Sequence, residues 1–124
     1  MKVMHPLVSV VDDDESVRES LPDLLKEFGF SAETFASAQQ FLPSHSVGKT
    51  RCLILDVAMP GMTGPDLQRE LSRRGLPIPI VYITAHRDET MRPRLIEQGA
   101  VECLFKPFSE AALQKALSSA FGAS

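Results

Sequence analysis

Residues with reactive or charged side chains follow four of the apolar segments in this sequence. An acidic run begins directly after residues 7–11, and single polar residues end or follow the segments 51–55, 79–84 and 101–105. These residues are Asp12, Asp13, Asp14, Asp56, Thr84 and Lys106. Carboxylates that converge with no histidine or thiolate beside them repel each other unless a cation lies between them. Such an all-oxygen site with room for water suits Mg²⁺, with Mn²⁺ as a substitute.

The lysine and the threonine extend this prediction from a metal site to a phosphoryl site. Lys106 is the only basic residue placed to balance the acids, and Thr84 offers a hydroxyl donor. The metal and Lys106 would neutralise phosphoryl oxygens, and Thr84 would donate a hydrogen bond to one of them. Each residue alone also has a structural explanation; the acidic run, for example, suits a helix N-terminus. The placement of all of them at one edge of the same predicted sheet favours the functional explanation.

Short β-branched segments alternate five times with segments of helical periodicity. We expect strands at 7–11, 31–35, 51–55, 79–84 and 101–105, and helices at 17–28, 37–42, 63–74, 92–98 and 109–121. Strands that are apolar on both faces predict an α/β fold, a parallel sheet doubly wound by helices on both sides. In such sheets, ligands bind beyond the carboxyl ends of the strands, where the reactive residues lie.

Two prolines bear on the helix boundaries. Pro22 lies inside the first expected helix, so we expect a kink there or a shifted helix start. Pro93 fits the first turn of the fourth helix, which leaves residues 85–91 as a long, mobile loop.

Length and composition limit the class of protein. The chain has 124 residues, of which 44% are hydrophobic, and a formal net charge of −3. This length predicts one domain. No apolar run is long enough for a membrane span. The segment before the first expected strand is too short and too polar for a signal peptide. The mild acidity gives no general attraction to nucleic acid. Cys52 and Cys103 lie in apolar runs, which favours buried thiols in a reducing cytoplasm.

Several motifs resemble those of response-regulator receiver domains. They are Val10-Val11-Asp12-Asp13-Asp14, the run Leu53-Ile54-Leu55-Asp56-Val57-Ala58-Met59-Pro60-Gly61-Met62, then Ile83-Thr84-Ala85 and Lys106-Pro107-Phe108. The likeness extends from about residue 7 to residue 121. It implies a single receiver domain over residues 1–124, with a five-stranded (βα)5 flavodoxin-like sheet in the strand order 2-1-3-4-5. The details are similar to receivers of helix-turn-helix transcription regulators.

The resemblance also implies roles for individual residues. Asp56 would be the phosphoacceptor for a sensor histidine kinase, in a protein that assists its own phosphorylation and dephosphorylation but is not otherwise an enzyme. Asp12, Asp13, Asp56 and the backbone carbonyl of Ala58 would hold Mg²⁺. Thr84 and Lys106 would contact the phosphoryl group, and the Lys106–Pro107 peptide bond would be cis.

Two positions need a separate interpretation. The metal-binding acidic pair could be Asp13 and Asp14; we choose Asp12 and Asp13 because the family pair directly follows the strand, which leaves Asp14 as an N-cap. Cys103 stands where the family usually has tyrosine or phenylalanine. In the family this aromatic ring is a switch: its position reports phosphorylation to one surface of the domain. That surface is formed here by the expected helix at 92–98, strand at 101–105 and helix at 109–121. We therefore expect Thr84 and the 85–91 loop to carry most of the conformational signal.

The resemblance implies partners as well. These are a sensor histidine kinase, a C-terminal helix-turn-helix output domain acting in transcription, and a second copy of the chain in a phosphorylation-dependent homodimer. We expect this domain to lie in the cytoplasm and to bind neither membrane nor nucleic acid by itself. Residues 122–124 look like the start of a linker.

Three alternatives compete with this interpretation. Asp12-x-Asp14-x-Ser16 also matches the start of haloacid-dehalogenase-like phosphatases, with Asp12 as the nucleophile; that family needs a further acidic motif, and Asp88-Glu89 does not have its pattern. A receiver that only binds partners is disfavoured because every phosphorylation residue is present. Flavin binding is disfavoured because the first loop is acidic, whereas a phosphate cradle needs glycine and backbone amides.

Overall fold

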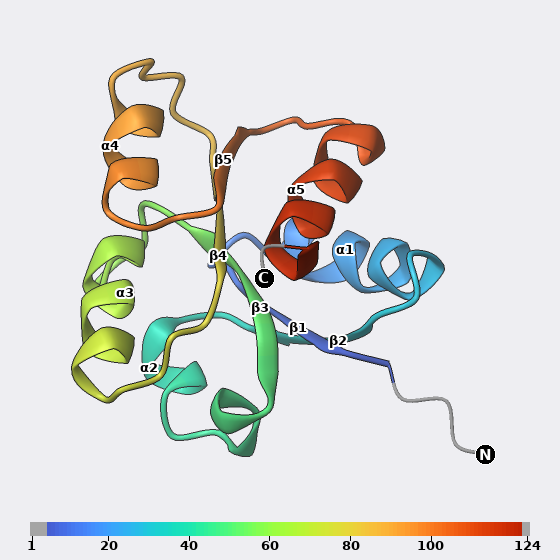
Figure 1. The fold of residues 1–124 in the computed structure, drawn as a ribbon, viewed down its shortest axis with the longest axis horizontal. Coiled ribbons are helices and arrows are strands. Elements are labelled where there is room, and N and C mark those ends of the chain that lie inside the picture. Colours follow the sequence, from blue (N-terminus) through green and yellow to red (C-terminus); the bar gives the residue numbers. More distant parts are fainter. Residues whose placement is uncertain (1–4, 123–124) are drawn as a thin grey trace.

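Five parallel strands form one sheet in the computed structural model, which describes residues 5–122 (Figure 1). The strands are β1 (Leu7–Val11), β2 (Ser31–Phe35), β3 (Thr50–Asp56), β4 (Ile80–Thr84) and β5 (Glu102–Phe105). Their order across the sheet is β2-β1-β3-β4-β5, and every neighbouring pair is parallel. The predicted fold class and strand order are therefore confirmed.

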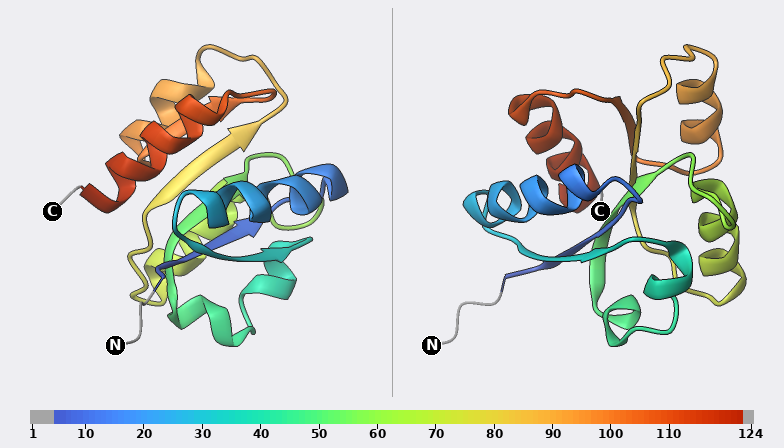
Figure 2. Two further views of the ribbon diagram at one scale, coloured as in Figure 1. Left: turned by 90° about the vertical axis from the view of Figure 1, so that its right-hand side faces the viewer. Right: turned by 180° about the vertical axis from the view of Figure 1, so that it is seen from behind.

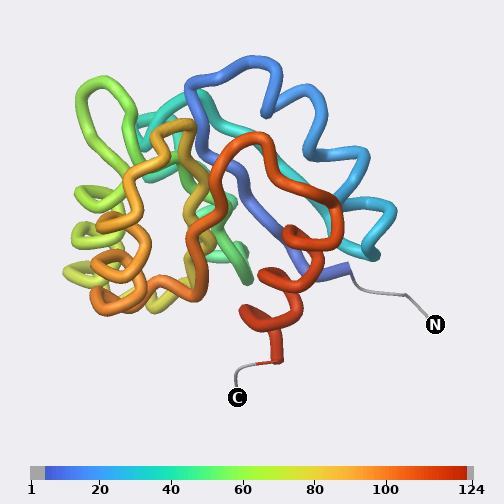
Figure 3. Tube along the Cα trace, turned by 90° about the horizontal axis from the view of Figure 1, so that it is seen from above, coloured from blue at the N-terminus to red at the C-terminus, as the bar shows by residue number. Residues whose placement is uncertain are grey.

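Helices cover both faces of this sheet. They are α1 (Glu15–Glu27), α2 (Ala38–Phe41), α3 (Gly64–Arg73), α4 (Met91–Glu97) and α5 (Glu110–Gly122). In Figure 2 and in the view from above in Figure 3, α1 and α5 lie on one face, while α2, α3 and α4 lie on the other. Each face has its own apolar core, so the sheet is buried on both sides.

The alternation of side chains along β4 separates these two cores. Tyr82 packs in the core beneath α3 and α4, whereas Val81 and Ile83 pack in the core beneath α1 and α5. All three side chains are fully buried, as expected for a central strand of a parallel sheet.

Side-chain caps fix where two of the helices begin. The Asp14 side chain accepts a hydrogen bond from the Ser16 N–H at the start of α1, so the predicted N-cap is confirmed. Thr63 and Asp66 form a capping box at the start of α3, in which each side chain accepts a hydrogen bond from the other's backbone N–H. These caps place the loops that precede both helices at the same edge of the sheet as the acidic run.

Two local features differ from the sequence analysis. Pro22 does not move the start of the first helix past itself: α1 begins at Glu15 and runs through the proline, whose missing N–H leaves the carbonyl of Arg18 without its usual helical donor, and the alternative of a kink stays a prediction. The short 3-10 helix His45–Gly48 was not predicted, because a single turn has no apolar periodicity to reveal it.

No helix within residues 5–122 is both long enough and apolar enough to cross a bilayer. Of the proposed linker, residues 123 and 124 lie outside the described part of the chain.

Candidate functional site

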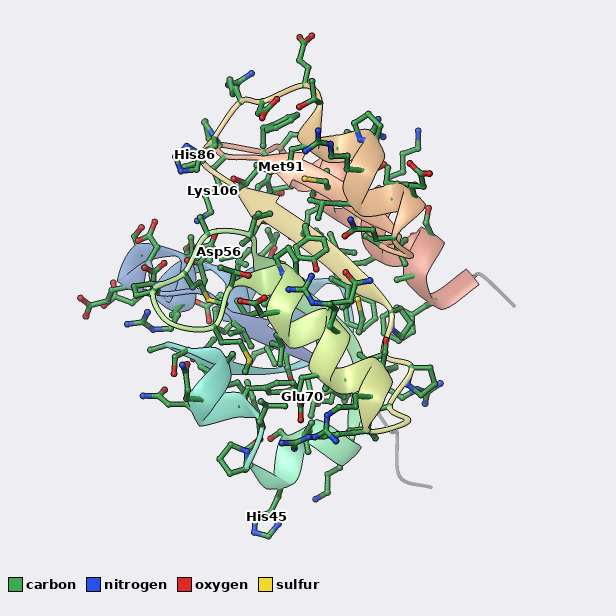
Figure 4. All side chains as sticks on the ribbon, turned by 90° about the vertical axis from the view of Figure 1, so that its left-hand side faces the viewer. His45, Asp56, Glu70, His86, Met91 and Lys106 are labelled. Atoms are coloured by element: carbon green, nitrogen blue, oxygen red, sulfur yellow. The ribbon has the colours of Figure 1, made fainter. Side chains whose placement is uncertain are left out.

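The carboxyl ends of four strands bring the predicted site residues to one edge of the sheet. Asp12 directly follows β1, Asp56 ends β3, Thr84 ends β4 and Lys106 directly follows β5. Figure 4 shows Asp56 and Lys106 at the same edge of the molecule, with His86 beside them. The parallel direction of the strands makes residues that are far apart in sequence neighbours here.

Three carboxylates form a compact cluster at this edge. Asp12, Asp13 and Asp56 each offer an oxygen that lies within 4.8 Å of the other two. The Asp12 and Asp56 side chains are buried, and Asp13 is exposed. Asp14 is engaged as the N-cap of α1, so the geometry favours Asp12 and Asp13, rather than Asp13 and Asp14, as the pair next to Asp56.

The carboxylate of Asp12 is held on both sides but is not fully hydrogen-bonded. Its Oδ1 accepts a hydrogen bond of 2.8 Å from the backbone N–H of Asp14. Its Oδ2 lies 2.8 Å from Nζ of Lys106, yet this buried oxygen accepts no hydrogen bond of regular geometry. A buried carboxylate oxygen with an unused lone pair, next to two more carboxylates, fits a divalent cation with oxygen ligands.

Electrostatics at the cluster also favour an added positive charge. Burial, together with the negative charge of Asp12, raises the pKa of the Asp56 carboxyl to about 7, although Lys106 works in the opposite direction. Burial tends to lower the pKa of Lys106, but the ion pair with Asp12 and the nearby charges of Asp56 and Asp14 outweigh burial and raise it. The lysine therefore stays protonated, and a proton or a cation near the Asp56 carboxyl is favoured over a bare negative charge there.

Thr84 and Lys106 are tied together through the backbone. The N–H of Lys106 donates a hydrogen bond of 2.8 Å to the carbonyl of Thr84. The Thr84 hydroxyl is fully buried and accepts a hydrogen bond of 3.1 Å from the N–H of His86, whose side chain is exposed.

The peptide bond between Lys106 and Pro107 is cis, as the sequence analysis expects. Ala58, whose carbonyl is an expected metal ligand, is exposed two residues beyond Asp56.

Arg18 belongs to this site although the sequence analysis did not select it. Its Nη1 donates a hydrogen bond of 2.8 Å to the backbone carbonyl of Asp12. The signal available in the sequence was a basic residue one turn beyond the Asp14 cap, but many surface helices carry one, so that spacing by itself does not indicate a function.

Comparisons with known proteins agree with this geometry. The sequence model of the response regulator receiver domain matches residues 8–118. The chain belongs to the response regulator receiver domain family. This family differs from the haloacid-dehalogenase-like phosphatases, the enzyme class considered as an alternative.

Two named relatives match this receiver domain over most of its length. It is 43% identical over 111 residues to Nodulation protein W of Bradyrhizobium diazoefficiens, covering 90% of this chain and 49% of the relative. It is 42% identical over 114 residues to the response regulator protein TodT of Pseudomonas putida, covering 92% of this chain and 50% of the relative. This receiver domain thus spans about half the length of the curated relatives that it matches.

Solved structures show the same similarity in three dimensions. The response regulator StyR superposes with a TM-score of 0.86 and 47% sequence identity, covering 97% of this chain and 61% of that one. The structure titled FixJ-N superposes with a TM-score of 0.82 and 34% identity, covering 95% and 94% of the two chains. This receiver domain is therefore a signalling module of the two-component type.

Proposed function

We propose that this receiver domain accepts a phosphoryl group on Asp56 from the phosphohistidine of a sensor kinase. An Oδ of Asp56 forms the new O–P bond as the N–P bond to the donor imidazole breaks, and the electron pair of that bond leaves with the imidazole nitrogen. The observation that supports this assignment is the convergence of Asp56 with Asp12, Asp13 and the Lys106 ammonium at one strand edge. Such transfers depend mainly on positioning and charge neutralisation, so a small site suffices.

The same residues fit a magnesium ion. Asp12, Asp13 and Asp56 would hold it, with the backbone carbonyl of Ala58 as a further ligand. When bound, the ion supplies positive charge to the phosphoryl oxygens. Lys106 neutralises another part of that charge, and the Thr84 hydroxyl donates a hydrogen bond once it is released from its contact with His86. With these groups the domain assists both its own phosphorylation and its own dephosphorylation.

The conformational signal begins at Thr84 in this proposal. Its hydroxyl accepts the N–H of His86, so a hydroxyl that turns toward the phosphoryl group gives up the contact that holds the start of the 85–90 loop. Cys103 is buried and lacks an aromatic ring, so it cannot report phosphorylation in the usual way of the family. The mobility of this loop remains a prediction.

The surroundings of the site suit approach by a macromolecular donor. A hollow of about 630 Å³ adjoins Lys106 and is lined by one face of α1 and by the segment around Pro107 and Phe108. Its apolar side chains, among them Leu21 and Phe108, would accept a kinase segment that presents phosphohistidine beside Lys106. We further propose a cytoplasmic location, a helix-turn-helix output domain acting in transcription and a homodimer formed on phosphorylation, because the matched relatives include transcriptional regulatory proteins about twice as long.

Mapping the phosphorylated residue tests the proposal. The protein is treated with a small acyl phosphate donor and Mg²⁺, and acid-labile phosphate is located by mass spectrometry after borohydride reduction. We expect one phosphate on Asp56, none in Asp56→Asn, and normal uptake in the matched control Asp14→Asn. Phosphate on Asp12 would support the phosphatase alternative instead. No phosphate on any residue of the parent protein would indicate a domain that only binds partners.

A further inference from the structure

The residue at position 103, Cys103, has a small side chain, and a tyrosine lies directly beside it on the neighbouring strand. Tyr82 of β4 pairs in register with Cys103 of β5, and both side chains pack in the core beneath α3 and α4. Tyr82 is fully buried, two residues before Thr84 on the same strand. An aromatic side chain is thus present next to the switch position, but on the neighbouring strand.

The ring of Tyr82 and the backbone of Asp56 both approach Gly64 closely. A Cβ built on Gly64, the first residue of α3, would lie 2.8 Å from Cε1 of Tyr82 and 2.5 Å from the backbone oxygen of Asp56. Gly64 also donates its N–H to the carbonyl of Val57, at 3.0 Å. Gly64 therefore lies against both the Tyr82 ring and the backbone of Asp56, so a shift of the Asp56 backbone toward α3 displaces Gly64 and, through it, the ring.

The hydroxyl of Tyr82 starts a chain of hydrogen bonds that leads to α4. It donates to Oε1 of Gln68 on α3 at 2.6 Å, and Nε2 of Gln68 donates to the backbone carbonyl of Gln98 at 3.1 Å. Gln98 is the C-cap of α4, where a carbonyl has no partner within its own helix. The carbonyl can only accept, so the Gln68 amide nitrogen must face it and the amide oxygen must face the phenol.

Gln68 is the polar link between α3 and α4. Among residues 5–122, no other hydrogen bond or ion pair joins these two helices. Hollows of about 350 and 370 Å³ lie next to this link, and Gln68 and Gln98 line both of them. Leu67 of α3 and Leu95 of α4 share the apolar core beneath these helices, whereas at the solvent side the contact between α3 and the end of α4 is this pair of hydrogen bonds beside the hollows.

We propose that the chain Tyr82–Gln68–Gln98 couples the state of Asp56 to the C-terminal end of α4, in place of an aromatic side chain at position 103. The coupling rests on the proposed phosphorylation of Asp56. A change in the backbone at Asp56 displaces Gly64 and the Tyr82 ring, which alters the phenol–amide contact and, through Gln68, the support of the Gln98 carbonyl. Gln68 acts as a positioning residue and touches neither phosphate nor metal.

Amide hydrogen exchange on the whole chain tests this coupling. The N–H groups of Gln98, Gly99 and Ala100 donate to carbonyls of Arg94, Ile96 and Leu95, so their exchange reports opening of this end of α4. In the parent protein we expect Mg²⁺ with beryllofluoride, a phosphoryl analogue, to change their exchange rates by about fivefold or more. In Tyr82→Phe and Gln68→Leu the change should disappear, while uptake of phosphate on Asp56 stays at the parent stoichiometry.

Two further variants keep this test decisive. The double variant Tyr82→Phe/Gln68→Leu removes both polar partners together, so no buried hydroxyl is left without an acceptor if a single variant is unstable. Gln114→Leu makes the same replacement at an exposed position on α5 and should respond like the parent. Tyr82 is the only tyrosine and the chain has no tryptophan, so in Gln68→Leu its emission should no longer respond to beryllofluoride, whereas in the parent it should.

The outcomes separate the two proposals. If the variants accept phosphate and still show the parent response at residues 98–100, or if Gln114→Leu loses the response too, the coupling is wrong and the phosphorylation proposal stands. If the parent neither takes up phosphate nor responds to beryllofluoride, the proposed function fails, and the coupling fails with it.

Discussion

Nζ of Lys106 lies 2.8 Å from Oδ2 of Asp12, although these residues follow strands that are not neighbours in the sheet. In the order β2-β1-β3-β4-β5, two strands separate β1 from β5. The lysine side chain therefore reaches across the ends of β3 and β4, where Asp56 and Thr84 lie. This ion pair places the lysine ammonium at the phosphoacceptor edge and balances part of the charge of the buried acids.

Replacing Lys106 by methionine should destabilise the protein. The change leaves the fully buried Asp12 carboxylate without its cation, and breaking a buried pair typically costs about 3–5 kcal/mol. Because the Lys106 side chain is 17% exposed, we expect a smaller loss, about 2–3 kcal/mol in the free energy of unfolding. Urea denaturation measures it, and Mg²⁺ should reduce the loss by supplying positive charge.

The matched control for this variant is Lys115→Met on α5, where the lysine is exposed and makes no ion pair with a residue in the range 5–122. It should change the unfolding free energy by less than about 0.5 kcal/mol. Equal effects of the two substitutions would show that the Lys106–Asp12 pair does not stabilise the fold.

The affinity for Mg²⁺ should rise with pH through the neutral range. Burial and the charge of Asp12 raise the pKa of Asp56 to about 7, so below that pH a proton competes with the ion for this carboxylate. We expect titration calorimetry to show an increase of up to about tenfold per pH unit below pH 7 and a plateau above it. The profile of Asp56→Asn should be flatter, since the titrating group is gone; an unchanged slope would contradict the assignment.

The raised pKa of Asp56 also predicts how the free energy of unfolding changes with pH. Without divalent ions, folded Asp56 keeps its proton up to about pH 7, whereas the unfolded chain releases it near the ordinary value of 3.8. Between these pH values the folded state binds more protons, so this group lowers the free energy of unfolding as the pH rises. Urea denaturation of the parent and of Asp56→Asn should therefore diverge from pH 4 to pH 7, with the variant becoming the more stable; parallel curves would contradict the raised pKa.

Gly64→Ala should damage both stability and phosphorylation. The new Cβ would lie 2.5 Å from the backbone oxygen of Asp56, so either that backbone or α3 must shift. We expect a loss of about 1–3 kcal/mol in the free energy of unfolding and a lower rate of phosphate uptake. Gly48→Ala is the matched control, because a Cβ there meets no atom within 4 Å. Similar behaviour of the two variants would show that the close approach at Gly64 is unimportant.

Both cysteines should resist alkylation in the folded protein. Burial raises the pKa of Cys52 to about 12 and that of Cys103, with a contribution from Glu102, to about 11. The thiolate is the reactive form, so iodoacetamide at pH 8 should label neither residue without denaturant and both in urea. Rapid labelling of Cys103 in the native protein would show that β5 opens readily.

The amino-acid sequence by itself determined the order and type of the main elements. Apolar runs such as residues 7–11 and 79–84 are long enough to indicate buried strands, and the alternation with helical segments predicts the parallel sheet. It also determined that Asp12, Asp56, Thr84 and Lys106 lie at one edge, because every parallel strand ends on the same side. These predictions rest on the periodicity of apolar residues and on the direction of parallel strands, and both can be inferred from short segments of sequence.

Only the tertiary structure decided which side chains meet. Asp14 turns away to cap α1 while Asp13 joins Asp12 and Asp56, a choice between adjacent aspartates that composition and spacing left open. The hydrogen bond from Arg18 to the Asp12 carbonyl and the chain Tyr82–Gln68–Gln98 each join separate elements. Such contacts depend on the packing distance and rotation of whole helices, and those quantities follow from the combined burial of many residues rather than from any one segment.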